Sequence, residues 1–202
     1  NILLNELNLV TADAEPDDAA CLFICTPTTD LSSDEADKII SYLDAGGELL
    51  LVTDYSETPM PNLASLGAYY GLHTVDGIVI EGSTEHCAYG YPQYVLPDIA
   101  SHEITDPILK NNYSVLMPIV QGIVPDATYR SSLTMTPLLT TSAESYSKIS
   151  AMDMTTTDKE DGDIDGPFNL GILVTESLGD QETKLIWFGG SSFLADQVDS
   201  SV

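Results

Sequence analysis

The chain has 202 residues, 43% of them apolar and 19% charged, so it can bury the core of one domain of ordinary size. The chain is strongly acidic, because it has 32 acidic residues and only 6 basic ones, which gives a formal net charge of −26. A polyanion repels phosphate backbones and gains nothing from an anionic membrane surface, which argues against nucleic-acid and lipid-surface binding. Cations and basic proteins remain as partners, although acidity that serves only solubility is the simpler interpretation.

The first pattern in the chain predicts a strand–helix–strand unit. The run 19–27 is continuously apolar until it meets a proline, which is typical of a strand buried on both faces. A helix should follow, because Ser32 or Ser33 can cap it and apolar residues recur on one face as far as Gly46–Gly47. The run 48–55 predicts a second buried strand, joined to the first by a parallel crossover.

The rest of the chain predicts a second helix, several further strands and an irregular segment. Residues 83–114 show no clear period and are expected to form an irregular insertion. We predict a single α/β domain over residues 1–202, with an open, mostly parallel sheet flanked by helices and a C-terminal antiparallel strand pair. The remaining expected elements are a helix over 62–72, strands over 77–82, 114–124, 133–142 and 166–177, and a last strand within 183–194 that turns into a helix at Ser191 or Ser192.

Two residues could act as a nucleophile at the end of a strand. Ser191 lies in "WFGGSSFLAD", but the nucleophile-elbow pattern G-x-S-x-G would need glycine where Phe193 stands. Cys25 ends the first strand, where open α/β sheets bind ligands, but no glycine-flanked helix start follows it. His102 or His86 would have to supply the base. A tight turn and a buried structural cysteine explain these positions better, so an amidotransferase-like hydrolase stays the alternative.

The acidic stretch "DKEDGDIDGPF" contains half of a calcium-binding pattern. Asp161, Asp163 and Asp165 spell D-x-D-x-D-G, but the bidentate glutamate of a complete loop would fall on Ile172, inside an apolar strand. We predict a solvated connection between strands, with weak Ca²⁺ binding left open.

No cofactor or metal motif is complete, since neither a dinucleotide fingerprint nor a P-loop occurs. The odd number of cysteines gives no disulfide framework, and Cys21 and Cys25 are expected to be small core residues. We therefore predict no catalytic residue, no cofactor and no metal site. Tyr89, Tyr91 and Tyr94, together with the acidic stretch, leave a carbohydrate-binding surface as a weaker alternative.

The order of motifs resembles the auxiliary domain of Gld-type (gliding-motility-like) ABC transport systems. The stretch "AACLFICTPTTDLSSDEADKIISYLDAGGELLLVTDY" is similar to an early segment of that family, and "NLASLGAYYGLHTVDGIVIE" to the next one. "HEITDPI", "TPLLTTSAESY", "GPFNLGILVTE" and "LIWFGGSSFLAD" follow in the family's order, so the resemblance covers nearly the whole chain.

The resemblance implies a flavodoxin-like or class I glutamine amidotransferase-like fold without the amidotransferase nucleophile. It implies a non-enzymatic auxiliary domain for binding or assembly, whose partners are the membrane and ATPase subunits of an ABC transport system. It places the domain on the extracytoplasmic face of a bacterial cell membrane, as a fragment of a longer protein anchored by segments outside residues 1–202. One departure is that Gly189–Phe193 replaces an acidic "GDSDF"-like turn of the family, so no role of those acids carries over.

Overall fold

The computed structural model describes residues 3–11, 19–179 and 181–195. Its helices are α1 (Ser33–Asp44), α2 (Pro61–Tyr69) and α3 (Asp106–Lys110), with 3₁₀ turns η1 (Thr84–His86), η2 (Ala151–Asp153) and η3 (Ser192–Leu194). Its strands are β1 (Leu22–Cys25), β2 (Glu48–Val52), β3 (Leu72–Thr74), β4 (Ile78–Ile80), β5 (Tyr94–Val95), β6 (Asp98–Ile99), β7 (Met117–Pro118), β8 (Ile123–Pro125), β9 (Leu133–Thr140), β10 (Tyr146–Lys148), β11 (Ile164–Asp165), β12 (Asn169–Leu178) and β13 (Gln181–Phe188). No helix among the described residues has the length and apolar character needed to cross a bilayer.

The main sheet is mixed, so the expectation of an open, mostly parallel sheet flanked by helices, flavodoxin-like or class I glutamine amidotransferase-like, was wrong. Its order is β1-β2-β13-β12-β8-β3, and β9 joins it by pairing with β12 and β6. Only β1–β2 and β2–β13 are parallel, and the other pairs within the described part of this sheet are antiparallel. Parallel neighbours need a long crossover, and after α2 the described chain has no helix longer than the five residues of α3.

The β1–α1–β2 unit is confirmed. β1 pairs in parallel with β2, with Leu22 opposite Leu49. α1 begins where the sequence predicts, because Ser32 forms a complete capping box with Glu35. It buries Ala36, Ile39 and Leu43, the apolar positions of its inner face. The predicted C-terminal antiparallel pair is also present, as β12 and β13.

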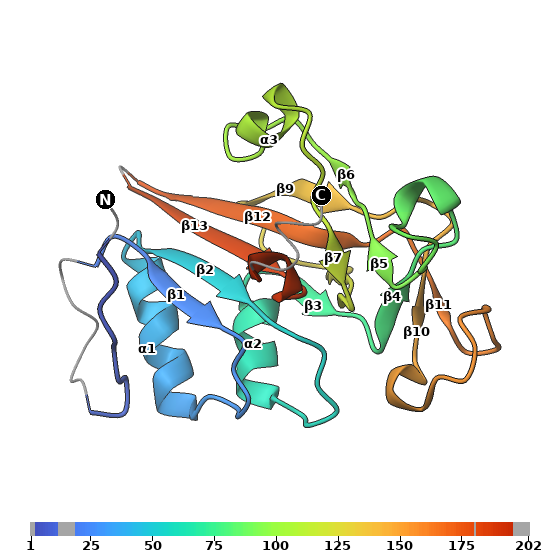
Figure 1. Ribbon diagram of the computed structural model, residues 1–202. Coiled ribbons are helices and arrows are strands. Elements are labelled where there is room, and N and C mark those ends of the chain that lie inside the picture. The colour runs from blue at the N-terminus through green and yellow to red at the C-terminus, as the bar shows by residue number, and fades with distance from the viewer. Residues whose placement is uncertain (1–2, 12–18, 180, 196–202) are drawn as a thin grey trace.

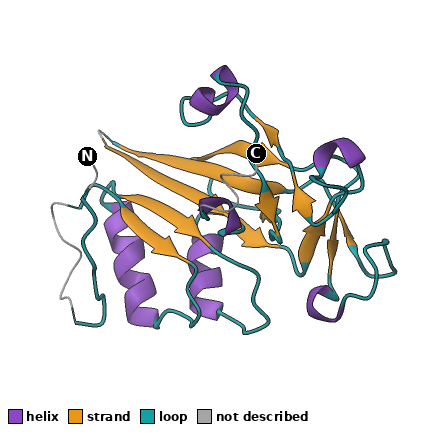
Figure 2. Ribbon diagram, in the orientation of Figure 1, coloured by secondary structure: helices purple, strands orange, loops and turns teal. Residues whose placement is uncertain are grey.

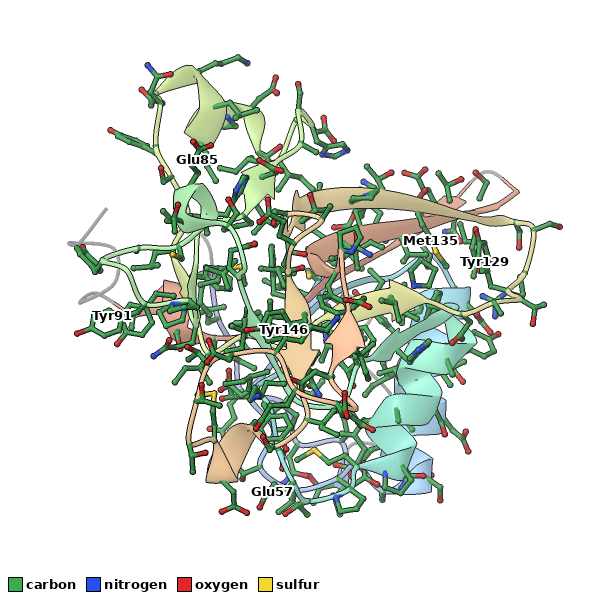
Figure 3. The ribbon with its side chains drawn as sticks, turned by 90° about the vertical axis from the view of Figure 1, so that its right-hand side faces the viewer. Glu57, Glu85, Tyr91, Tyr129, Met135 and Tyr146 are labelled. Atoms are coloured by element: carbon green, nitrogen blue, oxygen red, sulfur yellow. The ribbon has the colours of Figure 1, made fainter. Side chains whose placement is uncertain are left out.

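Both long helices lie on one side of the main sheet (Figures 1 and 2). The core between them and the sheet is built around Trp187, Leu66, Ile39 and Ile172, with Met135 packed at its margin. Tyr129 and Met135 lie next to each other at the α2 end of this layer (Figure 3), where both approach Gly71. The helices therefore leave the opposite side of the sheet to other parts of the chain.

Short strands cover part of that opposite side. β5 pairs with β7, and β4 joins β10 and β11 in a separate three-stranded sheet (Figure 1). A second core forms there around Val120, Leu138, Phe168 and Leu173. The segment 83–114 contains η1, β5, β6 and α3. The strand predicted over 77–82 is present as β4, but it belongs to the small sheet and not to the main one.

The first strand is not buried on both faces, which corrects the prediction for 19–27. In β1 the buried Leu22 and half-buried Ile24 alternate with exposed Phe23 and Cys25. Cys21 is exposed as well, so neither of these two cysteines is a core residue. The reason is positional, because β1 lies at the end of the sheet order and the helices cover only one of its faces.

Candidate functional site

The parallel strands β1, β2 and β13 end at one edge of the main sheet. Cys25 is the last residue of β1, Asp54 follows β2 by two positions, and Gly189–Ser191 follows β13. The structure therefore brings both predicted nucleophile candidates to the same edge, where α/β sheets bind ligands. The sequence pattern did not single out Asp54, because this residue lies within the strand predicted over 48–55. An acidic residue at the end of that apolar run was the signal that could have found it.

Ser191 is held by a carboxylate and not by an imidazole. Its backbone N–H donates to Oδ1 of Asp54 at 2.7 Å, and its hydroxyl donates to Oδ2 at 2.8 Å. Both donors are thereby used to fix the turn after β13 against the end of β2. The predicted helix after Ser191 is only the single turn η3, and the Ser191 side chain does not cap it.

The two glycines before Ser191 allow a close approach of two backbones. A Cβ at Gly189 would lie 2.0 Å from the carbonyl oxygen of Gln121, and one at Gly190 would lie 3.2 Å from the Val120 side chain. The backbone N–H of Gln121 donates to the Gly189 carbonyl at 2.7 Å. These glycines therefore let the segment after β13 pack closely against Val120 and Gln121.

The three histidines have other partners. Nδ1 of His73 lies 2.6 Å from Oδ1 of Asp126. His86 contacts Ser83 at 3.1 Å through Nδ1 and Asp98 at 3.3 Å through Nε2.

Nδ1 of His102 accepts the backbone N–H of Ile104 at 3.2 Å. In the part of the chain that the structure describes, no imidazole is hydrogen-bonded to Cys25 or Ser191. The alternative of a hydrolase with His102 or His86 as base has no assembled nucleophile–base pair in this geometry.

A cavity of about 290 Å³ lies beside Asp54. Trp187 forms part of its wall, and its indole N–H donates to Thr53 Oγ1 at 2.9 Å. The wall carries two carboxylates and one imidazole but no lysine or arginine, so it fits a small polar or cationic molecule better than an anion. Its polar and aromatic lining residues are Thr53, Asp54, Ser56, Thr58, His73, Thr74, Asp76, Gln121 and Trp187.

The predicted tyrosine surface lies elsewhere. Tyr89 and Tyr91 are exposed, Tyr94 is half-buried, and the rings of Tyr91 and Tyr94 lie 5.3 Å apart. Tyr91 points away from the body of the molecule (Figure 3). Neither these tyrosines nor the acidic residues 158–163 line the cavity beside Asp54, so the features proposed for carbohydrate binding do not form one site with it.

The acidic stretch is organised around a lysine. The Lys148 side chain is fully buried, and its Nζ lies 2.6 Å from Glu160 and 3.2 Å from Asp163 and donates to the Asp158 carbonyl at 2.7 Å. Asp163 also accepts the Glu160 N–H at 2.8 Å. Asp165 pairs with Lys159. The stretch is therefore not simply a solvated connection, because it closes over an ammonium group of its own chain.

Lys148 and Asp163 each stabilise the charged form of the other. Burial opposes ionisation of Asp163, but hydrogen bonds from Glu160 N–H and Lys148 outweigh it and lower the pKa of this carboxyl group. Burial likewise opposes the charge on Lys148, and the bonds to Glu160 and Asp163 raise the pKa of its ammonium group. Lys148 was missed by the sequence analysis, and the available signal was a rare basic residue in a chain of net charge −26.

Calcium is not expected to bind this stretch. Asp163 is directed at Lys148 and Asp165 at Lys159, and no group of three or more metal-binding side chains assembles within the described residues. Addition of 5 mM CaCl₂ should leave the melting temperature unchanged relative to the same ionic strength of NaCl, since only general screening acts. Differential scanning calorimetry provides the measurement. A calcium-specific rise in melting temperature that Asp161→Asn and Asp165→Asn abolish would contradict this expectation.

Comparison with known proteins identifies the family. The model of the family described as "ABC-type uncharacterized transport system" matches residues 4–202. The chain belongs to this family. The membership agrees with the resemblance found in the sequence motifs and gives the domain a place among the auxiliary proteins of ABC-type transport systems.

The solved structures add information about the fold alone. The structure titled "mmIFT52 N-terminal domain" is similar to this transport-system protein, with a TM-score of 0.59 and 16% identity. The match covers 90% of this chain and 70% of that chain. No curated protein matches the chain. The amidotransferase-like fold that the motifs implied is not supported by these comparisons.

Proposed function

We propose that this chain is a non-enzymatic, extracytoplasmic domain that binds or assembles components of an ABC transport complex. The family match over residues 4–202 carries the proposal, because it relates almost the entire chain to transport-system auxiliary proteins. The partners in this proposal are the membrane and ATPase subunits of the transporter. Its location is the extracytoplasmic face of a bacterial cell membrane, held there by anchoring segments outside these residues.

The geometry of the sheet edge supports a role without catalysis. Acyl transfer needs a nucleophile with a base in hydrogen-bond reach and a third group that orients the base. Ser191 instead donates to Asp54, and this contact joins β2 to the turn after β13. Cys25 ends an edge strand and is followed by Thr26 and Pro27, not by the start of a helix that could activate a thiol.

The proposal is tested by purification of the full-length tagged protein from detergent-solubilised membranes of its own host. An ABC ATPase and a permease are expected in amounts comparable to the bait, as quantified by mass spectrometry against an untagged strain. A Cys25→Ser/Ser191→Ala double variant should retrieve the same subunits in equal amounts, because neither side chain has a chemical role here. Recovery of the bait without any transporter subunit would overturn the proposal, and so would labelling of the tagged protein by a fluorophosphonate that Ser191→Ala removes.

A further inference from the structure

The side of the main sheet opposite α1 and α2 carries a row of apolar side chains that crosses four strands. Phe23 lies opposite Leu50 and Leu50 opposite Ile186, and the next partner in the same register is Leu173 on β12. Side chains alternate along a strand, so these residues face away from Leu22, Leu49 and Leu185 in the helix-side core. We call Phe23, Leu50 and Ile186 the open row.

The side chains of this row become more exposed to solvent from β12 toward β1. Leu173 is 5% exposed within the second core, Leu50 and Ile186 are half-buried, and Phe23 is 48% exposed. At the carboxyl end of the strands, η3 provides cover, since the Phe193 ring lies 5.0 Å from the Phe188 ring. Away from η3, none of the helices α1, α2 and α3 lies over β1 and β2 on this side (Figures 1 and 2).

An uncovered face is unusual for parallel strands. β1, β2 and β13 are parallel to one another, and parallel strands occur almost exclusively with both faces covered, usually by helices. The sequence of β1, with its continuous apolar run, has the composition of a strand covered on both sides. Among the described residues, α1 and α2 cover one side only. On the other side Ile186 packs against the second core, and cover is incomplete over Leu50 and Phe23.

The charges beside the open row are mainly negative. Lys184 lies in the neighbouring row, 3.2 Å from Glu48 and 3.9 Å from Glu182. The hydrogen bond that Lys184 donates to Glu48 is the main reason that the pKa of Lys184 is raised, and the charges of Glu182 and Glu103 add to it. Three carboxylates thus surround one ammonium group, in a chain whose net charge of −26 disfavours a second acidic copy at this surface.

We infer that the open row is a docking surface for an amphipathic helix of a partner protein, with an apolar stripe flanked by lysine or arginine. A helix supplies the layer that parallel strands require, and the row Phe23–Leu50–Ile186 offers it an apolar strip. Basic flanks complement the carboxylates of Glu48 and Glu182. The inference follows from the sheet itself and holds whether or not the chain assembles with a transporter.

The test uses the 202-residue chain and two fluorescent 18-residue helical peptides that share one leucine stripe. One peptide has lysine flanks and the other has glutamate flanks. Fluorescence anisotropy should show binding of the lysine-flanked peptide, weaker binding in high salt, and at least tenfold weaker binding of the glutamate-flanked peptide. Phe23→Ser should weaken binding of the lysine-flanked peptide at least tenfold. The control Tyr113→Ser removes another exposed ring (65% exposed) and should change the affinity for this peptide less than twofold.

A second readout locates the peptide. Cys25 lies two residues from Phe23 on the same face, and Cys87 lies in another part of the fold. In a Cys21→Ser background, the lysine-flanked peptide should slow maleimide labelling of Cys25 but not of Cys87. The inference is overturned if no peptide binds, if Phe23→Ser and Tyr113→Ser act alike, or if Cys25 is not protected. It is also overturned if sedimentation shows a dimer that Phe23→Ser dissociates, since a second copy would then be the occupant.

Discussion

Replacement of Lys148 by methionine is expected to lower the melting temperature by about 10 °C, a larger loss than any other single charge in the described chain should cause. The ammonium group of Lys148 is buried and bonds to Glu160, Asp163 and the Asp158 carbonyl. Methionine fills a similar volume but leaves the carboxylate of Asp163, whose side chain is 2% exposed, without its cation. Thermal unfolding followed by circular dichroism measures the effect.

Lys159 provides the matched control, because it pairs with Asp165 in the same stretch but is itself 43% exposed. Lys159→Met should change the melting temperature by no more than about 2 °C, as is usual for exposed ion pairs. A Lys148→Met/Asp163→Leu double variant should recover at least half of the loss, since the buried charge is then absent. Equal losses in the two single variants would show that Lys148 does not organise the stretch.

Replacement of Trp187 by alanine is expected to reduce the free energy of unfolding by about 3–5 kcal/mol. This residue is 3% exposed in the core between helices and sheet, and its indole N–H bonds to Thr53. Gly67 of α2 packs so closely that a Cβ there would lie 2.7 Å from the indole ring. Truncation therefore opens a cavity under α2 and also removes part of the wall of the cavity beside Asp54.

The measurement for Trp187→Ala is urea denaturation followed by far-ultraviolet circular dichroism, because this is the single tryptophan of the chain. Trp187→Phe keeps most of the buried area and should lose less than half as much free energy. Tyr91→Ala, at a position 54% exposed, should stay within about 0.5 kcal/mol of the unchanged protein. If Trp187→Ala costs no more than Tyr91→Ala, the proposed role of the tryptophan in this core is wrong.

The sequence predicts local structure well where short-range chemistry decides it. Ser32 and Glu35 form the capping box that starts α1, and the apolar periodicity of the helix matches its buried face. Both features depend on residues only a few positions apart.

The direction of strand pairing is decided by partners far apart in the chain. β13 runs antiparallel to its sequence neighbour β12, as their short connection requires, but it also pairs in parallel with β2, and no local pattern reveals this distant partner. The same limit explains Phe23 and Cys25. Their apolar run looks like a strand buried on both faces, but whether a second layer lies above it depends on where the helices pack.

The sequence by itself determined the family, the β1–α1–β2 unit and the absence of a complete catalytic motif, because each of these depends on short contiguous stretches of residues. Only the tertiary structure showed that Ser191 donates to Asp54, 137 positions away, and that Lys148 is the cation inside the acidic stretch. Only the tertiary structure left Phe23 exposed at the sheet edge. The physical reason is common to all three, since charge pairing and burial depend on which distant segments the folded chain brings into contact.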